Sequence, residues 1–250
     1  MRVSSVAEQI ATAFQFLTRV PLPAFTWSPD GLSRSAKFFP LVGLAIGAAV
    51  ATLHVWFTPH FPAVIVAMLI VLFTVLVTGG LHEDGLADVA DAFGGGRNRD
   101  HILAILKDSR IGSYGAIALT FSIASRILLL AAIPENQFAR YVISAQVLCR
   151  WTILPLGFML PAARKQEGQG ARLAKEISCI SLTAGTLISF SIVIFLLRMD
   201  AVGPLLTVLL VTLFSGFYYR WRMGGITGDC FGTTIQLAEI AAYICGAWRR

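Results

Sequence analysis

The sequence predicts an all-α protein, a polytopic membrane helix bundle of about six or seven transmembrane helices plus an N-terminal interfacial helix. Of the 250 residues, 56% are hydrophobic and only 14% are charged, whereas a soluble domain typically carries about 25% charged residues. The apolar residues also fall into stretches of about 20, the length that a helix needs to cross the hydrocarbon core. No linker or internal repeat interrupts the chain, so we expect a single integral membrane domain over residues 1–250.

The first predicted helix covers residues 6–20. Its apolar residues recur at helical spacing, with polar positions such as Glu8, Gln15 and Arg19 between them. This pattern is typical of an amphipathic helix that lies in the membrane interface. Pro21 ends it, because proline cannot continue a helical hydrogen-bond ladder.

Seven candidate transmembrane segments follow. They cover residues 38–57, 61–81, 112–133, 138–160, 177–197, 201–219 and 230–247. The last segment carries the weakest signal, because it contains Gln236 and Glu239.

The basic residues indicate the orientation of the bundle. They concentrate in alternate connections, at residues 1–37, 82–111, 161–176 and 220–230. Cytoplasmic loops carry an excess of Lys and Arg, so these loops and the N-terminus are expected in the cytoplasm. Arg249 and Arg250 do not fit this orientation, since seven crossings would place them outside. Either the last segment does not fully cross the membrane, or these two charges are tolerated there.

The net charge of +6 does not indicate a nucleic-acid-binding protein. The chain has no Lys/Arg-rich run interleaved with aromatic residues, and the membrane orientation explains the basic loops. We therefore expect membrane lipid, and no nucleic acid, as a partner.

Residues 79–96, GGLHEDGLADVADAFGGG, place acidic groups directly after a predicted span. On a helix of about 100° per residue, Asp84, Asp88 and Asp91 fall within roughly 60° of one another. Three carboxylates on one face repel unless a positive charge lies between them. A hard divalent cation such as Mg²⁺ prefers such oxygen ligands, so the three aspartates are the predicted metal site.

His82 and Glu83 flank this site and are candidates for a catalytic base or for groups that support the ligands. The alternative is a solvated polar helix whose acids pair with Arg97, Arg99 or Lys107. Ionisable groups at the membrane boundary are costly, which favours a functional site.

A second motif, KDSRIGSYG, covers residues 107–115. Lys107 and Arg110 could clamp phosphate oxygens, and Arg110 could do so with two parallel hydrogen bonds. Asp108 and Ser109 supply oxygen ligands beside these cations. The alternative is a positively charged anchor at the membrane interface.

A third motif, RWRMGGITGDCFG, covers residues 220–232 and contains Arg222 and Asp229. Its glycines can expose backbone N–H groups to an anion; the alternative is an ordinary turn with a helix N-cap. Arg150 and Glu239 lie inside predicted spans, where an unpaired charge is costly. Arg150 is expected to line the site, whereas Glu239 is either a ligand or part of a structural ion pair.

These motifs, in this order, resemble the cobalamin synthase family, the adenosylcobinamide-GDP ribazoletransferases. FLTRVPLP at residues 16–23, FFPLVGLAIG at 38–47 and PAAR at 161–164 agree as well, so the resemblance covers about residues 14–240. The chain departs from the family pattern at Ala92-Phe93, where a glycine is expected soon after Asp91.

The resemblance implies a Mg²⁺-dependent enzyme of the bacterial inner membrane, and the distribution of basic residues places its active site on the cytoplasmic side. Such an enzyme joins adenosylcobinamide-GDP to α-ribazole, or to α-ribazole 5′-phosphate, and releases GMP. On this hypothesis the metal held by the three aspartates binds the diphosphate, and Glu83, Asp91 or His82 accepts the hydroxyl proton. Lys107, Arg110 and Arg222 would stabilise the phosphate charge. The residues expected to bind substrate are Asp108, Ser109, Arg150, Arg222 and Asp229.

Two other functions are compatible with parts of the sequence. A CDP-alcohol phosphotransferase also uses clustered aspartates on a membrane helix, but only the D-G-L-A-D part of its motif is present here. A secondary transporter would explain Arg150 and Glu239 inside spans, but no paired halves are visible. Glycine-rich spans such as residues 43–47 could pack closely against another helix, and a homo-oligomer is a further prediction.

Overall fold

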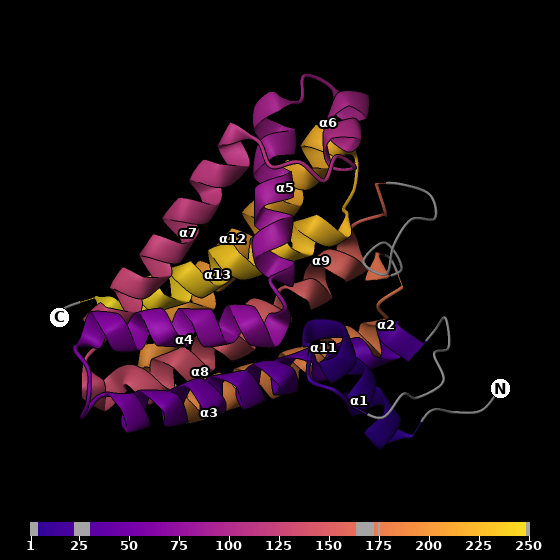
Figure 1. Ribbon diagram of the computed structural model, residues 1–250. Coiled ribbons are helices and arrows are strands. Elements are labelled where there is room, and N and C mark those ends of the chain that lie inside the picture. Colours follow the sequence, from indigo (N-terminus) through magenta and orange to yellow (C-terminus); the bar gives the residue numbers. More distant parts are fainter. Residues whose placement is uncertain (1–4, 23–30, 164–172, 175, 249–250) are drawn as a thin grey trace.

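The computed structural model describes residues 5–22, 31–163, 173–174 and 176–248 (Figure 1). The basic residues Arg164, Lys165, Arg172, Lys175, Arg249 and Arg250 lie outside this part of the chain. Within it, the helical elements are α1 (Val6–Leu17), α2 (Gly31–Ser35), η1 (Ala36–Phe38), α3 (Phe39–Phe57), α4 (Ala63–Thr78), α5 (Leu81–Gly95), α6 (Arg99–Ile105), α7 (Ser113–Ala132), α8 (Glu135–Trp151), α9 (Ile153–Met159), α11 (Cys179–Leu197), η2 (Arg198–Ala201), α12 (Val202–Met223) and α13 (Gly228–Ala247).

The helices confirm the predicted all-α membrane bundle. Five helical stretches of the described chain are long and apolar enough to cross a membrane, or six when α4 and α5 count together as one bent span. One of these stretches, Cys179–Met223, contains two predicted spans, because α12 follows α11 through the short helix η2. Large apolar side chains such as Phe121, Phe195 and Phe214 are exposed on their outer faces, as expected of surfaces that contact lipid.

Helices α4 and α5 meet at an angle of 89°. Gly79 and Gly80 join them with φ values of 67° and 70°, a left-handed backbone that glycine adopts without steric cost. The backbone N–H of Arg19 donates to the carbonyl of Val77, so the segment after α1 lies beside this bend. The predicted span 61–81 therefore ends three residues early, and the acidic stretch forms a separate helix.

The predicted span 138–160 corresponds to one candidate span, Glu135–Met159, in which the helix is interrupted between α8 and α9. Pro155 lies in the first turn of α9, where its missing N–H costs nothing. Inside one continuous helix the same residue would remove the hydrogen bond to Trp151, which explains why the helix breaks before it.

The stretches that contain α8 and α13 are the most buried of the five candidate spans. Helix α13 contacts α5, α7, α8 and α12, while α3 packs along α8. Gly43 and Gly47 of α3 lie directly on the α8 backbone at Gln146 and Ile143. The predicted close packing of residues 43–47 against another helix is therefore confirmed within one chain, and it provides no support for a homo-oligomer.

Candidate active site

The acidic helix α5 crosses α13 with almost no space between the two backbones. A Cβ added at Gly85 would lie 2.7 Å from the carbonyl oxygen of Asp229, and one added at Gly232 would lie 3.2 Å from the Cα of His82. The Thr233 hydroxyl donates to the carbonyl of Gly85 at 2.9 Å. These contacts bring the first turn of α13, with Asp229, against the acidic face of α5.

Four carboxylates share this crossing. Burial, followed by the charges of Asp84, Asp229 and Asp91 in that order, raises the pKa of Asp88 from 3.8 to about 7. Asp84 is exposed, whereas Asp88, Asp91 and Asp229 are half-buried. The three predicted aspartates therefore do lie near one another, and Asp229, which the sequence placed in a separate anion-binding loop, joins them from α13.

Asp91 is held by the start of α7. Its carboxylate accepts hydrogen bonds from the backbone N–H groups of Gly112 at 2.7 Å and Gly115 at 2.9 Å. These are two of the N–H groups that a helix N-terminus leaves without an intrahelical partner. A Cβ at either glycine would overlap this carboxylate, so the glycines of KDSRIGSYG serve the contact with Asp91.

The predicted phosphate clamp lies on the exposed loop between α6 and α7. Arg110 donates through Nε and Nη2 to Asp108 at 2.6–3.1 Å, and its side chain is 87% exposed. These hydrogen bonds hold the pKa of Asp108 at about 2. Lys107 and Ser109 are also exposed. The loop thus carries two exposed cations, and Arg110 is paired with Asp108 in this structure.

Arg222 contacts α5 instead of pointing into solvent. Its Nη2 donates to the carbonyls of Phe93 and Gly96 at 3.0 and 2.9 Å, and its guanidinium lies over the Phe93 ring. A cation at this position supplies a hydrogen-bond donor to carbonyl groups at the C-terminal end of α5 and interacts favourably with the helix dipole. Arg99, which the sequence offered only as an ion-pair partner, has a comparable role, because it donates to the carbonyls of Met223 and Ala163.

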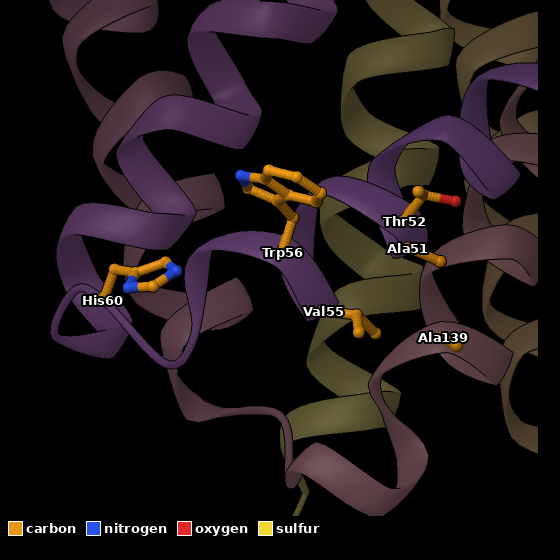
Figure 2. Close-up of a pocket in the computed structure, with 6 residues that line it drawn as sticks. All are labelled: Ala51, Thr52, Val55, Trp56, His60 and Ala139. Atoms are coloured by element: carbon orange, nitrogen blue, oxygen red, sulfur yellow. The ribbon is translucent and has the colours of Figure 1, made fainter.

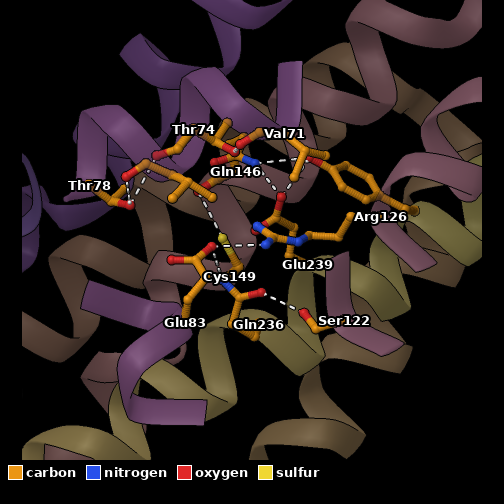
Figure 3. A network of polar contacts seen from close by, with 12 residues as sticks. Val71, Thr74, Thr78, Glu83, Ser122, Arg126, Gln146, Cys149, Gln236 and Glu239 are labelled. Carbon is orange, nitrogen blue, oxygen red and sulfur yellow. Dashed lines mark hydrogen bonds and ion pairs between the residues drawn. The ribbon is translucent and has the colours of Figure 1, made fainter. Parts of the chain in front are cut away.

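His82, Glu83, Arg150 and Glu239 are all buried, and Figure 3 shows Glu83 and Glu239 on either side of Arg126 in one polar network. Glu83 accepts from Arg126 at 2.9 Å, and Arg150 donates to the side chain of Gln146 at 2.6 Å. Glu239 accepts from Gln146 and lies 3.9 Å from Arg126. The structure therefore places Glu239 in a buried ion-pair network, the second of its two predicted alternatives.

Within the described residues, no three His, Cys, Asp or Glu side chains converge closely enough to hold a metal ion. The donor set at the α5–α13 crossing nevertheless fits a divalent cation. Asp84, Asp91 and Asp229 all raise the pKa of Asp88, which means that their charges repel, and a bound cation would relieve this repulsion.

An open hollow of about 590 Å³ lies elsewhere, beside the C-terminal half of α3 (Figure 2). It is lined by Ala51, Thr52, Val55, Trp56, His60 and Ala139. None of these residues belongs to the acidic crossing or to the loop between α6 and α7, so the hollow is separate from the candidate site.

Comparison with known proteins agrees with the motif order. The sequence profile of the family described as cobalamin-5-phosphate synthase matches residues 9–247. The adenosylcobinamide-GDP ribazoletransferases of Sinorhizobium medicae and Azorhizobium caulinodans are both 37% identical to the chain, over 94% and 96% of each sequence. That of Thermoanaerobacter pseudethanolicus is 32% identical, over 95% of the chain and 96% of its own length. No solved structure matches. The match over almost the entire length shows that this chain belongs to the cobalamin-5-phosphate synthase family.

Proposed function

We propose that the chain is an adenosylcobinamide-GDP ribazoletransferase. It takes adenosylcobinamide-GDP and α-ribazole, or α-ribazole 5′-phosphate, and produces adenosylcobalamin, or its 5′-phosphate, together with GMP. The observation that carries this proposal is the group of four carboxylates where α5 crosses α13, at the ends of membrane helices. Full-length similarity to ribazoletransferases supports the choice of substrates and favours neither the lipid enzyme nor the transporter.

The proposed reaction is a phosphoryl transfer. A ribose hydroxyl oxygen of α-ribazole forms a bond to the phosphorus on the cobinamide side of the diphosphate. The bond from that phosphorus to the bridging oxygen breaks, GMP leaves with the bridging oxygen, and the hydroxyl proton passes to a base. Positioning and charge neutralisation provide most of the catalysis in reactions of this kind.

Asp84 and Asp88 are the residues that we propose to hold Mg²⁺, with Asp229 as the third carboxylate. Bound Mg²⁺ would neutralise charge on the diphosphate of the donor substrate. Asp91 was the third predicted ligand, but both of its oxygens accept backbone hydrogen bonds from the start of α7. We therefore propose that Asp91 positions the loop between α6 and α7 relative to the carboxylates.

Lys107 and Arg110 lie on the loop that Asp91 holds, and both are exposed. We propose that they contact the phosphates of the donor, with Arg110 exchanging Asp108 for a phosphate oxygen. Arg222 acts without contacting the phosphates, since it fixes the C-terminal end of α5 through two backbone carbonyls. Three residues were predicted as the base that accepts the hydroxyl proton. Glu83 and His82 are buried in the bundle, and the Asp91 carboxylate accepts hydrogen bonds from the start of α7.

The proposed location is the bacterial inner membrane, with the carboxylates on the cytoplasmic side. The basic residues of the connections on the same side as the acidic helix support this orientation. Helix α5 leads from the bend after α4 to the start of α7 (Figure 1), whose backbone N–H groups bind Asp91.

The experiment that tests the proposal uses the full chain in lipid nanodiscs with adenosylcobinamide-GDP, α-ribazole and Mg²⁺. Asp84→Asn is expected to lower cobalamin formation by at least about 100-fold, since even indirect support of a metal is typically worth 10–100-fold. Asp100→Asn is the matched control, because the Asp100 side chain is 94% exposed on α6. Activity of Asp84→Asn equal to that of this control would show that the carboxylates do not carry the reaction.

A further inference from the structure

Glu83 is adjacent to Asp84 in sequence but has entirely different surroundings. Successive residues on a helix are about 100° apart, so Glu83 points about 100° away from Asp84 and about 140° away from Asp88. Asp84 is exposed, whereas Glu83 is 8% exposed. One face of α5 therefore carries the proposed cation ligands, and another carries a buried carboxylate.

The Glu83 carboxylate is bound by two other helices. Its Oε1 accepts from Nη2 of Arg126 on α7 at 2.9 Å and from Nε2 of Gln236 on α13 at 3.0 Å. Gln236 is itself held, because its Oε1 accepts from the hydroxyl of Ser122 at 2.9 Å. These contacts connect α5 to α7 and α13 (Figure 3).

The connection continues into the centre of the bundle. Arg126 lies 3.9 Å from Glu239, whose Oε1 accepts from Gln146 and from the hydroxyl of Tyr243, both at 2.9 Å. Gln146 in turn accepts from Arg150 at 2.6 Å. The network contains two carboxylates and two guanidinium groups, so its formal charges balance.

Stability alone does not explain such a network. A buried ion pair of this kind typically adds no more stability than apolar side chains of the same volume, because both charges must be removed from water. Ionisable groups at membrane depth are rare for the same reason, and they mark functional positions. What a charged pair with defined geometry can provide is one fixed arrangement of the helices that carry it.

The α5–α13 crossing requires this kind of fixation. The backbones touch through Gly85 and Gly232, and the Thr233 hydroxyl donates to the Gly85 carbonyl across this contact. Rotation of α5 about its axis would move Asp84 and Asp88 away from Asp229 without breaking an apolar contact at those two glycines. A hydrogen bond from a different face of α5 opposes that rotation, in addition to those of Asp91 and Gly85.

We propose that Glu83 is a positioning residue, held by Arg126 and Gln236, which sets the rotation of α5 so that Asp84 and Asp88 face Asp229. This inference rests on the proposed cation site and adds the group that aligns it. It also assigns Glu83 a role other than that of the proton acceptor, since its carboxylate contacts α7 and α13 and lies away from the acidic face.

The test measures metal affinity without turnover, on the full chain in nanodiscs. Mn²⁺ is the probe, because it takes the same oxygen ligands as Mg²⁺ and its free concentration can be followed by electron paramagnetic resonance. Glu83→Gln is expected to weaken Mn²⁺ binding by about 10-fold, the range typical of groups that orient metal ligands. Saturating Mg²⁺ should then restore most of the turnover, with an unchanged pH profile.

Tyr243→Phe is the matched control. It removes two hydrogen bonds from the same network, to Glu239 and Gln146, without touching α5. It is expected to lower the unfolding temperature and leave Mn²⁺ affinity unchanged. If Glu83→Gln also lowers only the unfolding temperature, Glu83 has a structural role alone and the inference is wrong.

Two further variants separate the remaining outcomes. Gln236→Leu removes one hydrogen-bond donor to Glu83 and keeps the charges of Glu83 and Arg126. It should therefore also weaken Mn²⁺ binding, by a smaller factor, and it remains informative if Glu83→Gln does not fold.

Loss of turnover in Glu83→Gln at saturating Mg²⁺ with normal Mn²⁺ affinity would identify Glu83 as the base and overturn the inference. If Asp84→Asn leaves Mn²⁺ affinity unchanged, the proposed cation site itself is wrong, and the inference fails with it.

Discussion

The pKa of Asp88 is raised by burial and by neighbouring carboxylates, so its titration gives a direct pH test. Its pKa is raised from 3.8 to about 7 by burial and by the charges of Asp84, Asp229 and Asp91. In the metal-free protein the folded state therefore binds a proton more tightly than the unfolded state between these two values. The contribution of this group to stability is full below pH 3.8 and is lost as the pH rises through 7.

A divalent cation should reverse this loss, since it binds the ionised form. We expect Mg²⁺ to raise the unfolding temperature in nanodiscs strongly at about pH 8 and weakly at about pH 5.5, where Asp88 retains its proton. Asp88→Asn, which cannot ionise, should show a much smaller Mg²⁺ effect at both values. An equal effect of Mg²⁺ on the native chain at the two pH values would contradict a cation bound by Asp88.

For individual residues, the sequence predicted those features of the site that depend on spacing within one helix. Asp84 and Asp88 are one helical turn apart, so their shared face follows from the helix alone. The hydrogen bonds of Asp91 to Gly112 and Gly115 join residues more than 20 positions apart, and the approach of Asp229 depends on how α5 and α13 cross. No local pattern encodes either contact, so the sequence alone did not associate Asp91 with the start of α7 or Asp229 with α5.

The crossing of α5 and α13 can be tested through its glycine. Gly85→Ala would place a Cβ within 2.7–3.3 Å of the backbone of Asp229, where a rigid helix cannot easily yield. We expect the variant to lose about 1–3 kcal/mol of stability, the usual cost of overpacking. It should also lose Mg²⁺-dependent activity, because the two sets of carboxylates are forced apart.

Gly203→Ala on α12 is the control for this substitution. The Cβ at Gly203 would make an ordinary contact of 3.7 Å with Cys245, and alanine favours the helix. Thermal unfolding and activity in nanodiscs provide the measurement. If both variants behave alike, the close approach at Gly85 does not determine the site.

Among the elements, helix positions were predictable but bends were predictable only in part. Hydrophobic length places α3, α4, α7 and α11 to within a few residues, because each must span the same apolar layer. Gly79 and Gly80 indicated a turn, but the angle of 89° between α4 and α5 depends on the packing of α5 against α7 and α13. The break before α9 follows from Pro155, which the mean hydropathy of the whole segment does not show.

In the whole molecule, the apolar outer surface and the buried polar centre have complementary roles. Exposed side chains such as Phe195 and Phe214 face outward from α11 and α12, while Arg126, Arg150 and Glu239 lie inside. A membrane helix bundle must pair its interior charges within the protein. Asp84 and Asp88, which we propose as cation ligands, lie outside this buried network.

The orientation of the bundle provides the last prediction. Ser109, on the loop between α6 and α7, and Asn136, at the start of α8, are both exposed and lie at opposite ends of α7. We expect Ser109→Cys to react with a membrane-impermeant thiol reagent only from the cytoplasmic side, and Asn136→Cys only from the other side.

The measurement uses a background in which the accessible Cys179 and Cys245 are replaced by serine, since Cys149 and Cys230 are buried. Labelling of Ser109→Cys in inverted vesicles, and of Asn136→Cys in right-side-out cells, places the carboxylates of α5 where soluble nucleotide substrates have access. The reverse pattern would place these carboxylates on the outer side, away from any cytoplasmic supply of a GDP-activated substrate, and would contradict the proposed location of the site.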